Sequence, residues 1–373
     1  MRCMIIVSCG GCKLMRIRPK WLFLVNLNRN VFLIFFYNDK RLEIVEDFSY
    51  LGILFNYNGI ISKAKAKLVE QARRAMFSII QKSRKLNLTI SMQLHLSDTK
   101  IVPILLYGSE AWGVENLKIL EQFHLKFCKF ILNLKPSTPN CMVYGELGML
   151  PITLQAKSRL LCYWSKLLNT KDNKICKILY KTILHLHNSN IHTSPWISFV
   201  KCNLDELGLS EYFINQKVTN LRHFKSLVKT RLQDHFVQNW NNSVDNSHKC
   251  LVYRMYKKVH CFEKYLDILP HNLAKTLCKF RTMNHSLPTD KGRHYNIERC
   301  ERKCTLCDKH SIGDEFHYLF ECDFFSASRK KSVPKYYFNH PSSFKLDDLM
   351  NCKIKSKLIK LALFCKTILS KLK

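Results

Sequence analysis

The chain has 373 residues, of which 47% are hydrophobic and 24% are charged. This length allows two or three domains, and the apolar fraction excludes a generally disordered chain. The 60 lysines and arginines outnumber the 28 aspartates and glutamates, for a formal net charge of +32. So many positive charges repel one another unless a polyanion offsets them, so we expect RNA or DNA as the partner. A membrane surface is the alternative, but the basic residues are spread along the whole chain.

The 17 cysteines have no convincing secretory signal ahead of them. The first residues contain only a short apolar run, Met4 to Val7, and the longer run from Trp21 to Tyr37 is interrupted by polar residues. Because a membrane-spanning helix needs about 20 mostly apolar residues, none is predicted. We therefore expect reduced thiols and a cytoplasmic or nuclear protein.

β-structure is predicted only in the N-terminal part of the chain. Residues 1–30 show no clear period and are expected to be poorly ordered or degenerate. From Val31 onward, β-forming residues alternate on both sides of the turn residues Asn38-Asp39, a pattern that predicts a β-hairpin. A second short strand is predicted over Phe48–Phe55, with Gly52 allowing a close backbone approach.

Ser62 is the predicted N-cap of a long helix in which apolar residues from Leu68 to Leu86 recur every three or four positions. The other side carries eight basic residues against one acid, Glu70. A solvated face is the plainer alternative, but we favour a surface that contacts phosphates. The predicted nucleic-acid-binding residues are Lys63, Lys65, Lys67, Arg73, Arg74, Lys82, Arg84 and Lys85.

Helical periodicity continues along most of the chain. A helix over 91–106, interrupted by Pro103, and one over 117–134 complete a three-helix bundle. We assign the aromatic stripe of the third helix to the core rather than to a base-stacking surface. Further helices are predicted at 152–169, 172–187, 219–240, 272–283 and 352–373, with a turn at Pro195-Trp196 and an exposed linker over Asn239–Lys249.

The spacing C-x2-C-x9-H-x4-C predicts a structural zinc site. Its ligands would be Cys304, Cys307, His317 and Cys322, and the turn residues Gly313-Asp314 let the chain double back between the two pairs. Structural zinc takes four sulfur or nitrogen ligands in a tetrahedron, so no position stays open for chemistry. Chance is the alternative in a chain with 17 cysteines, and Cys300 and His294 are possible substitute ligands.

Motifs typical of catalysis are missing from the sequence. Polymerases and nucleases need clustered carboxylates to hold two metal ions, and the adjacent pair Asp347-Asp348 is interpreted as a helix start. There is no G-x-x-x-x-G-K-S/T loop and no G-x-S-x-G elbow. We expect neither enzyme activity nor a small-molecule substrate.

Four blocks together resemble the C-terminal part of the reverse transcriptase of non-LTR (LINE-type) retrotransposons. Phe48-Ser-Tyr-Leu-Gly-Ile53 is similar to the family's F-x-Y-L-G-I segment, and Pro103–Gly113 to its P-x-L-x-Y-G-S-E-x-W-G block. Val143-Tyr-Gly-Glu-Leu-Gly148 is similar to a block of invertebrate elements, and the Cys/His spacing matches the C-terminal CCHC knuckle.

The resemblance covers about residues 31 to 345 and implies the end of a palm (31–60), a thumb-like bundle (61–150), a helical region (151–290) and the knuckle (291–345). The residue pattern adds a terminal basic helix (346–373). The family's catalytic aspartates, including its Y/F-A-D-D turn, have no counterpart in this sequence. We therefore expect a truncated, non-catalytic fragment that binds RNA or DNA through basic helices and the knuckle. The alternatives are a zinc-stapled protein–protein adaptor, an enzyme completed by a separate catalytic subunit, or a product with no selected role.

The predicted fold class is mainly α: helical bundles with a small N-terminal β-hairpin and a small C-terminal zinc-knuckle-like module. The terminal basic helix is expected to pack on the knuckle rather than on a membrane.

Overall fold

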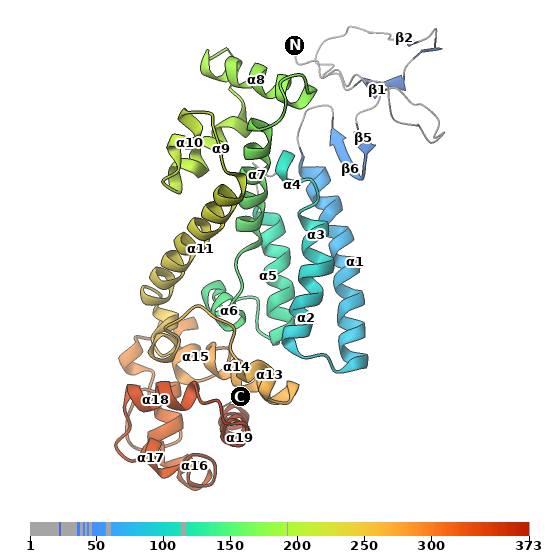
Figure 1. The fold of residues 1–373 in the computed structure, drawn as a ribbon. Helices are drawn as coiled ribbons and strands as arrows, with labels where there is room; N and C mark the ends of the chain where they lie inside the picture. The colour runs from blue at the N-terminus through green and yellow to red at the C-terminus, as the bar shows by residue number, and fades with distance from the viewer. Residues whose placement is uncertain are drawn as a thin grey trace.

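The structure is a computed structural model that describes residues 22–23, 36–37, 40–41, 43–44, 47–56, 61–112, 117–191 and 193–372. Within these ranges the chain forms nineteen α-helices, and strands occur only before Ser62 (Figure 1). The predicted fold class is confirmed. Most of the N-terminal segment that we expected to be poorly ordered, and Gly113 at the end of the Pro103–Gly113 block, lie outside the described residues.

Three pairs of short strands precede the helices. They are β1 (Leu22–Phe23) with β4 (Glu43–Ile44) in parallel, and two antiparallel pairs, β2 (Phe36–Tyr37) with β3 (Lys40–Arg41) and β5 (Asp47–Tyr50) with β6 (Ile53–Asn56). The β2–β3 pair lies where the sequence predicts a hairpin.

The single strand predicted over 48–55 is wrong, because the chain reverses in its middle. Leu51 and Gly52 both have positive φ, 48° and 84°, and this two-residue turn matches the twist of a hairpin. The Tyr107 hydroxyl donates to the Leu51 carbonyl at 2.8 Å, so two blocks that are distant in sequence meet at this turn.

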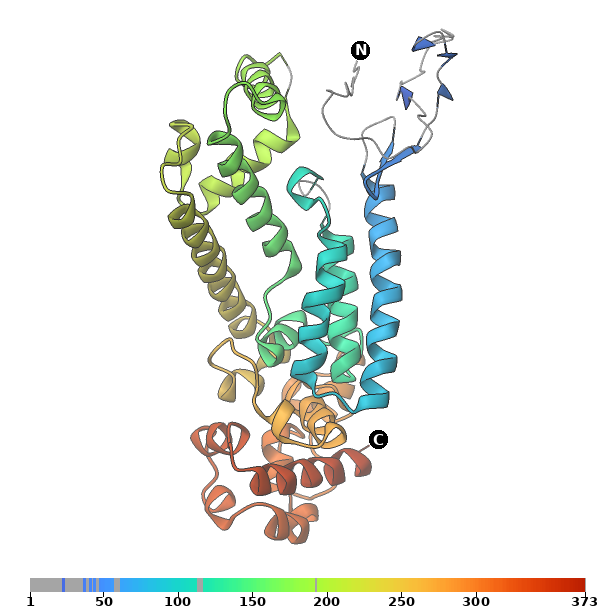
Figure 2. The ribbon, with the colours of Figure 1, turned by 45° about the vertical axis from the view of Figure 1, so that its right-hand side comes forward.

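The next helices form a bundle in which α1, α2–α3 and α5 lie side by side (Figures 1 and 2). The elements are α1 (Ser62–Leu86), α2 (Ile90–Leu96), the π-turn η1 (Ser97–Ile101), α3 (Val102–Leu105), α4 (Ser109–Trp112) and α5 (Lys118–Leu132). Ser62 does not cap α1, since the helix starts after Ile61 without a side-chain cap. Pro103 lies in the first turn of α3, where its missing N–H costs little.

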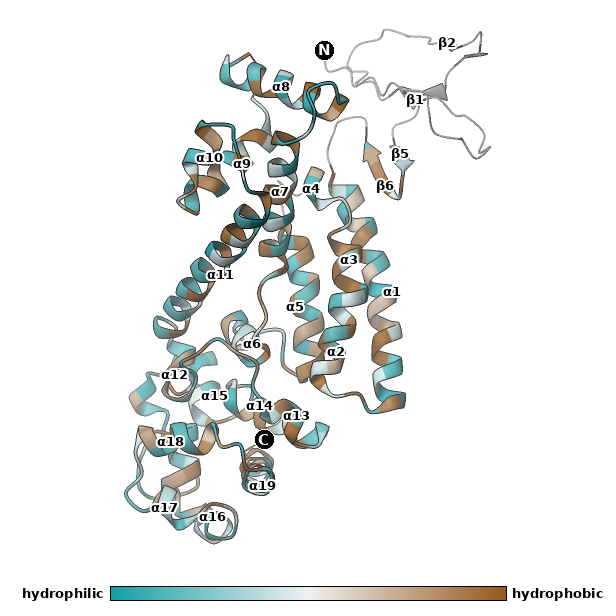
Figure 3. Ribbon diagram, viewed as in Figure 1, coloured by the Kyte–Doolittle hydropathy of each residue, from teal (hydrophilic) through white to brown (hydrophobic). Residues whose placement is uncertain are grey.

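Two long helices, α7 and α11, run beside each other and connect the bundle to a smaller group of helices. The elements of this part are α6 (Asn140–Leu147), α7 (Ile152–Leu168), α8 (Ile175–Asn188), α9 (Pro195–Glu206), α10 (Ser210–Ile214) and α11 (Leu221–Asp245). Each long helix contributes buried residues to two hydrophobic cores, such as Ala156 and Trp164 on α7. Figure 3 shows α11 as mostly hydrophilic with a few apolar positions along it.

Two predictions in this part are wrong. Pro195-Trp196 is the start of α9 and not a turn, because the Ser194 hydroxyl accepts from the Ile197 N–H and proline is tolerated in a first helical turn. The predicted linker over 239–249 is helical up to Asp245. Trp240 is buried there, and its indole N–H donates to the Cys141 carbonyl at 2.7 Å.

The C-terminal part consists of short helices around α14 and α19. The elements are η2 (His248–Cys250), α12 (Tyr253–Tyr256), α13 (Tyr265–Ile268), α14 (His271–Arg281), α15 (Pro288–His294), η3 (Arg299–Glu301), the π-turn η4 (His317–Glu321), η5 (Asp323–Phe325), α16 (Ser326–Ser332), α17 (Lys335–Phe338), α18 (Ser343–Met350) and α19 (Lys355–Lys371).

The terminal helix α19 packs on α14 and on α16, which follows the Cys/His segment. Leu358 and Ile368 of α19 are fully buried. Across the described residues, no helix combines the length and apolarity that crossing a membrane requires. The Asp347-Asp348 pair lies near the end of α18, so its interpretation as a helix start is wrong; the cap is Ser342.

Candidate metal centre and basic groove

The four predicted metal ligands converge in space. Their sulfur and nitrogen atoms all lie within 4.8 Å of one another, and they form the one such group of His, Cys, Asp or Glu found in the described part of the chain. The two sulfurs of Cys304 and Cys322 are 3.9 Å apart, and Cys307 Sγ is 3.4 Å from His317 Nε2. Ligands of a tetrahedral ion at 2.0–2.3 Å lie roughly 3.3–3.8 Å from each other. The cluster could therefore hold a metal ion.

A tight hairpin presents the first two cysteines. The Cys304 N–H donates to the Ser311 carbonyl and the Gly313 N–H to the Arg302 carbonyl, both at 2.8 Å. The chain therefore doubles back between Cys304 and Ser311, whereas the sequence predicts the reversal at Gly313-Asp314, which lies at the end of the returning arm. The Leu306 N–H points at Cys304 Sγ at 3.4 Å and orients that sulfur.

The π-turn η4 brings the other two ligands together. His317 and Cys322 are five residues apart, a spacing that an α-helix places on different faces. Here the Cys322 N–H donates to the His317 carbonyl at 2.9 Å, which is the i→i+5 bond of a π-turn. This bond stacks the two residues, so both side chains reach the same point.

Neighbouring groups fix the ligands. Glu321 Oε2 lies 3.3 Å from His317 Nδ1 and leaves Nε2 for the cluster, as expected of a metal-binding histidine. The buried Arg329 donates to the carbonyls of Leu319 and Cys322 at 2.7 and 2.6 Å. Burial and the nearby Cys304 sulfur raise the pKa of Cys322 to about 12. A bound cation would reverse that penalty, because it stabilises the thiolate.

The two possible substitute ligands do not join the cluster. Cys300 is exposed and lies 3.7 Å from Glu298, and His294 lines a different cavity.

The predicted basic residues of α1 are exposed with one exception. Lys65 is only 4% exposed, and its ammonium lies 5.4 Å from the centre of the Trp112 ring. This cation–π contact directs Lys65 into the protein, so its assignment as a phosphate-binding residue is wrong. Lys63 and Arg73 also have protein partners, Asp47 at 2.8 Å and Glu70 at 3.3 Å.

A groove runs between α1 and α5, and we call it the α1–α5 groove. It has a volume of about 320 Å³ and includes two aromatic side chains, Phe77 and Phe130, that are 59% and 46% exposed. Our assignment of the whole α5 aromatic stripe to the core is therefore wrong for Phe130, although Phe123 and Phe127 are buried.

The groove continues along α1 towards α14. Two adjoining hollows share Ile80 and Arg84 with the groove. One hollow adds Lys85, and the other adds Lys275. No carboxylate lines any of the three. Burial, Lys279 and Arg84 all lower the pKa of Lys275, which shows how closely the positive charges gather.

Sequence reasoning missed Phe77, Phe130, Lys126 and Lys275 as groove residues. A signal existed for Phe77, since positions 73, 77 and 84 share one helix face beside the apolar stripe. For Lys275 there was none, because α14 meets this region only through tertiary packing.

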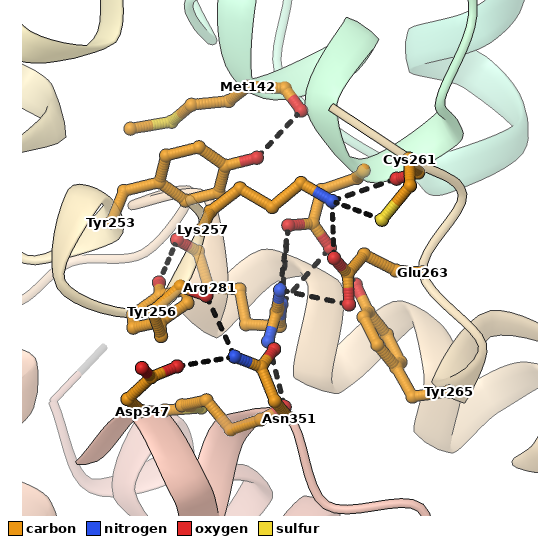
Figure 4. A network of polar contacts seen from close by, with 12 residues as sticks. Met142, Tyr253, Tyr256, Lys257, Cys261, Glu263, Tyr265, Arg281, Asp347 and Asn351 are labelled. Carbon is orange, nitrogen blue, oxygen red and sulfur yellow. Dashed lines mark hydrogen bonds and ion pairs between the residues drawn. The ribbon is translucent and has the colours of Figure 1, made fainter. Parts of the chain in front are cut away.

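A second polar cluster lies deep between α6, α14 and α18 (Figure 4). Arg281 and Glu146 are both fully buried, with Nε–Oε2 and Nη2–Oε1 distances of 3.1 Å. Glu263 joins Arg281 at 3.2 Å and also pairs with Lys257, and the Tyr265 hydroxyl donates to Glu146 at 2.6 Å. Because each charge is paired inside the protein, the arrangement supports a structural role.

This cluster explains the Val143–Gly148 block in physical terms. Glu146 is the buried acceptor, and Gly148 has a φ of +59° at the end of α6. A Cβ at Gly148 would lie 2.2 Å from the Phe262 backbone nitrogen.

Comparisons with known proteins give no relative: no family model, curated protein or solved structure matches the chain.

Proposed function

We propose that this chain binds unpaired RNA or DNA in the α1–α5 groove and along the exposed basic side of α1. The observation that carries the proposal is the groove itself, in which two half-exposed phenylalanines lie among arginines and lysines with no lining carboxylate. Proteins that bind single strands combine these two features, since bases stack on aromatic rings while cations follow the phosphates.

Within this proposal Phe77 and Phe130 stack bases, and Arg84, Lys126 and Lys275 contact the backbone. Contacts of both kinds are available to any base, so we expect little sequence selectivity. The resemblance to the end of a non-LTR reverse transcriptase supports the same role.

We further propose that the ion held by the Cys/His cluster is Zn²⁺. Three thiolates and one imidazole suit zinc, and they fill all four tetrahedral positions. The ion would then stabilise residues 300–325 without taking part in chemistry.

Binding of fluorescent single-stranded oligonucleotides with a 5′-hydroxyl tests the function. We expect Phe77→Ala and Phe130→Ala each to weaken binding by about 1–3 kcal/mol, roughly 5- to 150-fold in Kd. Tyrosine at either position should retain affinity. Phe344→Ala removes a ring from α18 that is 70% exposed and lies outside the groove, and it is the control.

The proposal fails if both groove variants bind like the wild-type protein, or if Phe344→Ala weakens binding as much as they do.

One observation favours the protein–protein adaptor as a second candidate. Helix α8 exposes an apolar stripe of Ile175, Ile178, Leu179 and Ile183 at helical spacing. An adaptor would capture a protein partner in the presence of nuclease and lose it on Ile178→Asp. Capture that disappears with nuclease would instead favour nucleic acid as the primary partner.

A further inference from the structure

We propose that the cavity between residues 135–139, η2 and the α14–α15 connection binds a phosphate monoester. The group could be the terminal phosphate of a nucleic acid strand or the phosphate of a free nucleotide, and both present the same dianion. The cavity is separate from the metal cluster and from the α1–α5 groove, so this inference does not rest on the proposed function.

The cavity has an excess of positive charge. Lys135, Lys249 and Arg293 line it, together with His294 and a single carboxylate, Asp290. Asp290 is already paired with Arg293. Neither Lys135 nor Lys249 forms an ion pair with a described residue, so two cations at the cavity have no anion from this part of the chain.

A buried amide in the cavity wall has no hydrogen-bond partner. Asn284 is 8% exposed, and its Nδ2 makes no hydrogen bond within the described structure. Leaving such a donor unsatisfied costs about 1–3 kcal/mol, so nearly all buried polar groups have partners. Asn284 lines the cavity, and its amide nitrogen, which solvent does not reach in this structure, has no acceptor from the described residues.

The backbone holds Asn284 in place. Met283 has a φ of 50°, and the Asn284 N–H donates to the Lys279 carbonyl at 2.9 Å, closing the end of α14. Glycine is the usual residue where Met283 stands, because a side chain there is strained. Asn284, which follows this strained position, is one of the residues that line the cavity.

The N-terminal end of α6 adds a favourable electrostatic field at the cavity. Pro139 lines the cavity and immediately precedes α6, which therefore starts there without a side-chain cap. The N-terminal end of a helix carries partial positive charge and attracts anions. Burial and the nearby Lys249 also lower the pKa of Lys129, consistent with positive charges gathered at this end of α5.

The volume of the cavity favours a phosphate group over a larger ligand. The cavity of about 240 Å³ is smaller than the roughly 300 Å³ at which sites for drug-sized molecules begin. It can take a phosphoryl group while the nucleoside or the rest of the strand stays outside.

The test uses the full chain and compares oligonucleotides that differ only in a 5′-phosphate or a 5′-hydroxyl. Calorimetry with inorganic phosphate and with adenosine monophosphate forms the second arm. If the source is a strand end, the 5′-phosphate should tighten binding roughly tenfold or more, as expected of charge-assisted hydrogen bonds. If the source is a free nucleotide, the monophosphate should bind and the strand end should give no gain.

In either case Lys249→Gln should remove the phosphate-dependent part of binding. Asn284→Asp keeps the shape and should also remove it by placing a carboxylate against the anion. Lys264→Gln, at a different cavity, is the control. If the Asn284 variant does not fold, Lys249→Gln still decides the result.

The proposal is overturned if inorganic phosphate and the monophosphate do not bind and the 5′-phosphate strand binds no more tightly than the 5′-hydroxyl strand. It is also overturned if Lys249→Gln leaves the phosphate-dependent binding intact. Loss of 5′-hydroxyl oligonucleotide binding with retained phosphate binding would sink only the proposed function.

Discussion

The Arg281 cluster and the α1–α5 groove differ in whether carboxylates surround their positive charges. Arg281 is enclosed, with two carboxylates, two tyrosine rings and the Met350 carbonyl around its guanidinium. The groove gathers Arg84, Lys126 and Lys275 around exposed aromatic rings without any lining carboxylate. Where the protein supplies the counter-charge, the cation holds helices together; where it supplies none, the charge is available to a ligand.

The metal cluster belongs with the enclosed region, and its loss should have the largest effect. Cys322→Ser removes one of four ligands, and we expect the metal content to fall from one ion per chain to background. Hydrogen exchange over residues 300–325 should then rise to the rate of an unfolded segment, because structural zinc sites depend on the ion for folding. Cys300→Ser, an exposed thiol outside the cluster, is the control. Equal behaviour of the two variants would rule out the site.

Breaking the Arg281 cluster should have the next largest effect. Arg281→Met leaves Glu146 buried without its partner, at a cost of about 3–5 kcal/mol in the free energy of unfolding. Lys258→Met breaks an exposed pair with Asp347 and should cost about 1 kcal/mol or less. Urea denaturation of the two variants measures the difference, and similar losses would contradict the distinction between the two kinds of pair.

His124 differs from both regions, because it is a buried polar side chain without a hydrogen-bond partner among the described residues. It is fully buried in α5, and neither ring nitrogen makes a hydrogen bond within the described structure. Burial lowers its pKa to about 4. Unfolding therefore takes up a proton below pH 6.5, so this contribution to stability is present above pH 6.5 and is lost as the pH falls towards 4.

We expect the pH dependence to be smaller in His124→Leu than in the wild-type protein. The difference in unfolding free energy between them should shift by about 1–3 kcal/mol between pH 7 and pH 4.5, from the linkage of about 1.4 kcal/mol per pH unit. Parallel stability curves across this range would show that His124 is not buried in its neutral form.

The sequence predicts local features well and tertiary ones poorly. The stripe of α1 and the Cys/His spacing are visible because helical period and ligand chemistry are properties of short segments. Lys65 could not be placed correctly, since its burial depends on Trp112 from another helix. The same holds for Trp240, whose bond to the Cys141 carbonyl keeps an apparently polar linker helical.

Charge pairing inside the core was also invisible in the sequence. Arg281 and Glu146 are 135 positions apart, and neither stands in a pattern that indicates burial. A buried arginine is rare and is recognised only once its partners are in place. Conversely, Phe130 continues the apolar stripe of α5, and only the packing of α1 against α5 leaves it exposed in the groove.

The salt dependence of oligonucleotide binding tests the central claim most directly. The logarithm of the association constant should fall with the logarithm of salt concentration, with a slope of about −2 or steeper if three or more phosphates are contacted at roughly 0.7 each. In Arg84→Gln/Lys126→Gln the slope should become shallower by about 1.4, while Lys360→Gln on α19 should leave it unchanged. A flat salt response of the wild-type protein, or an unchanged slope in the double variant, would contradict the account.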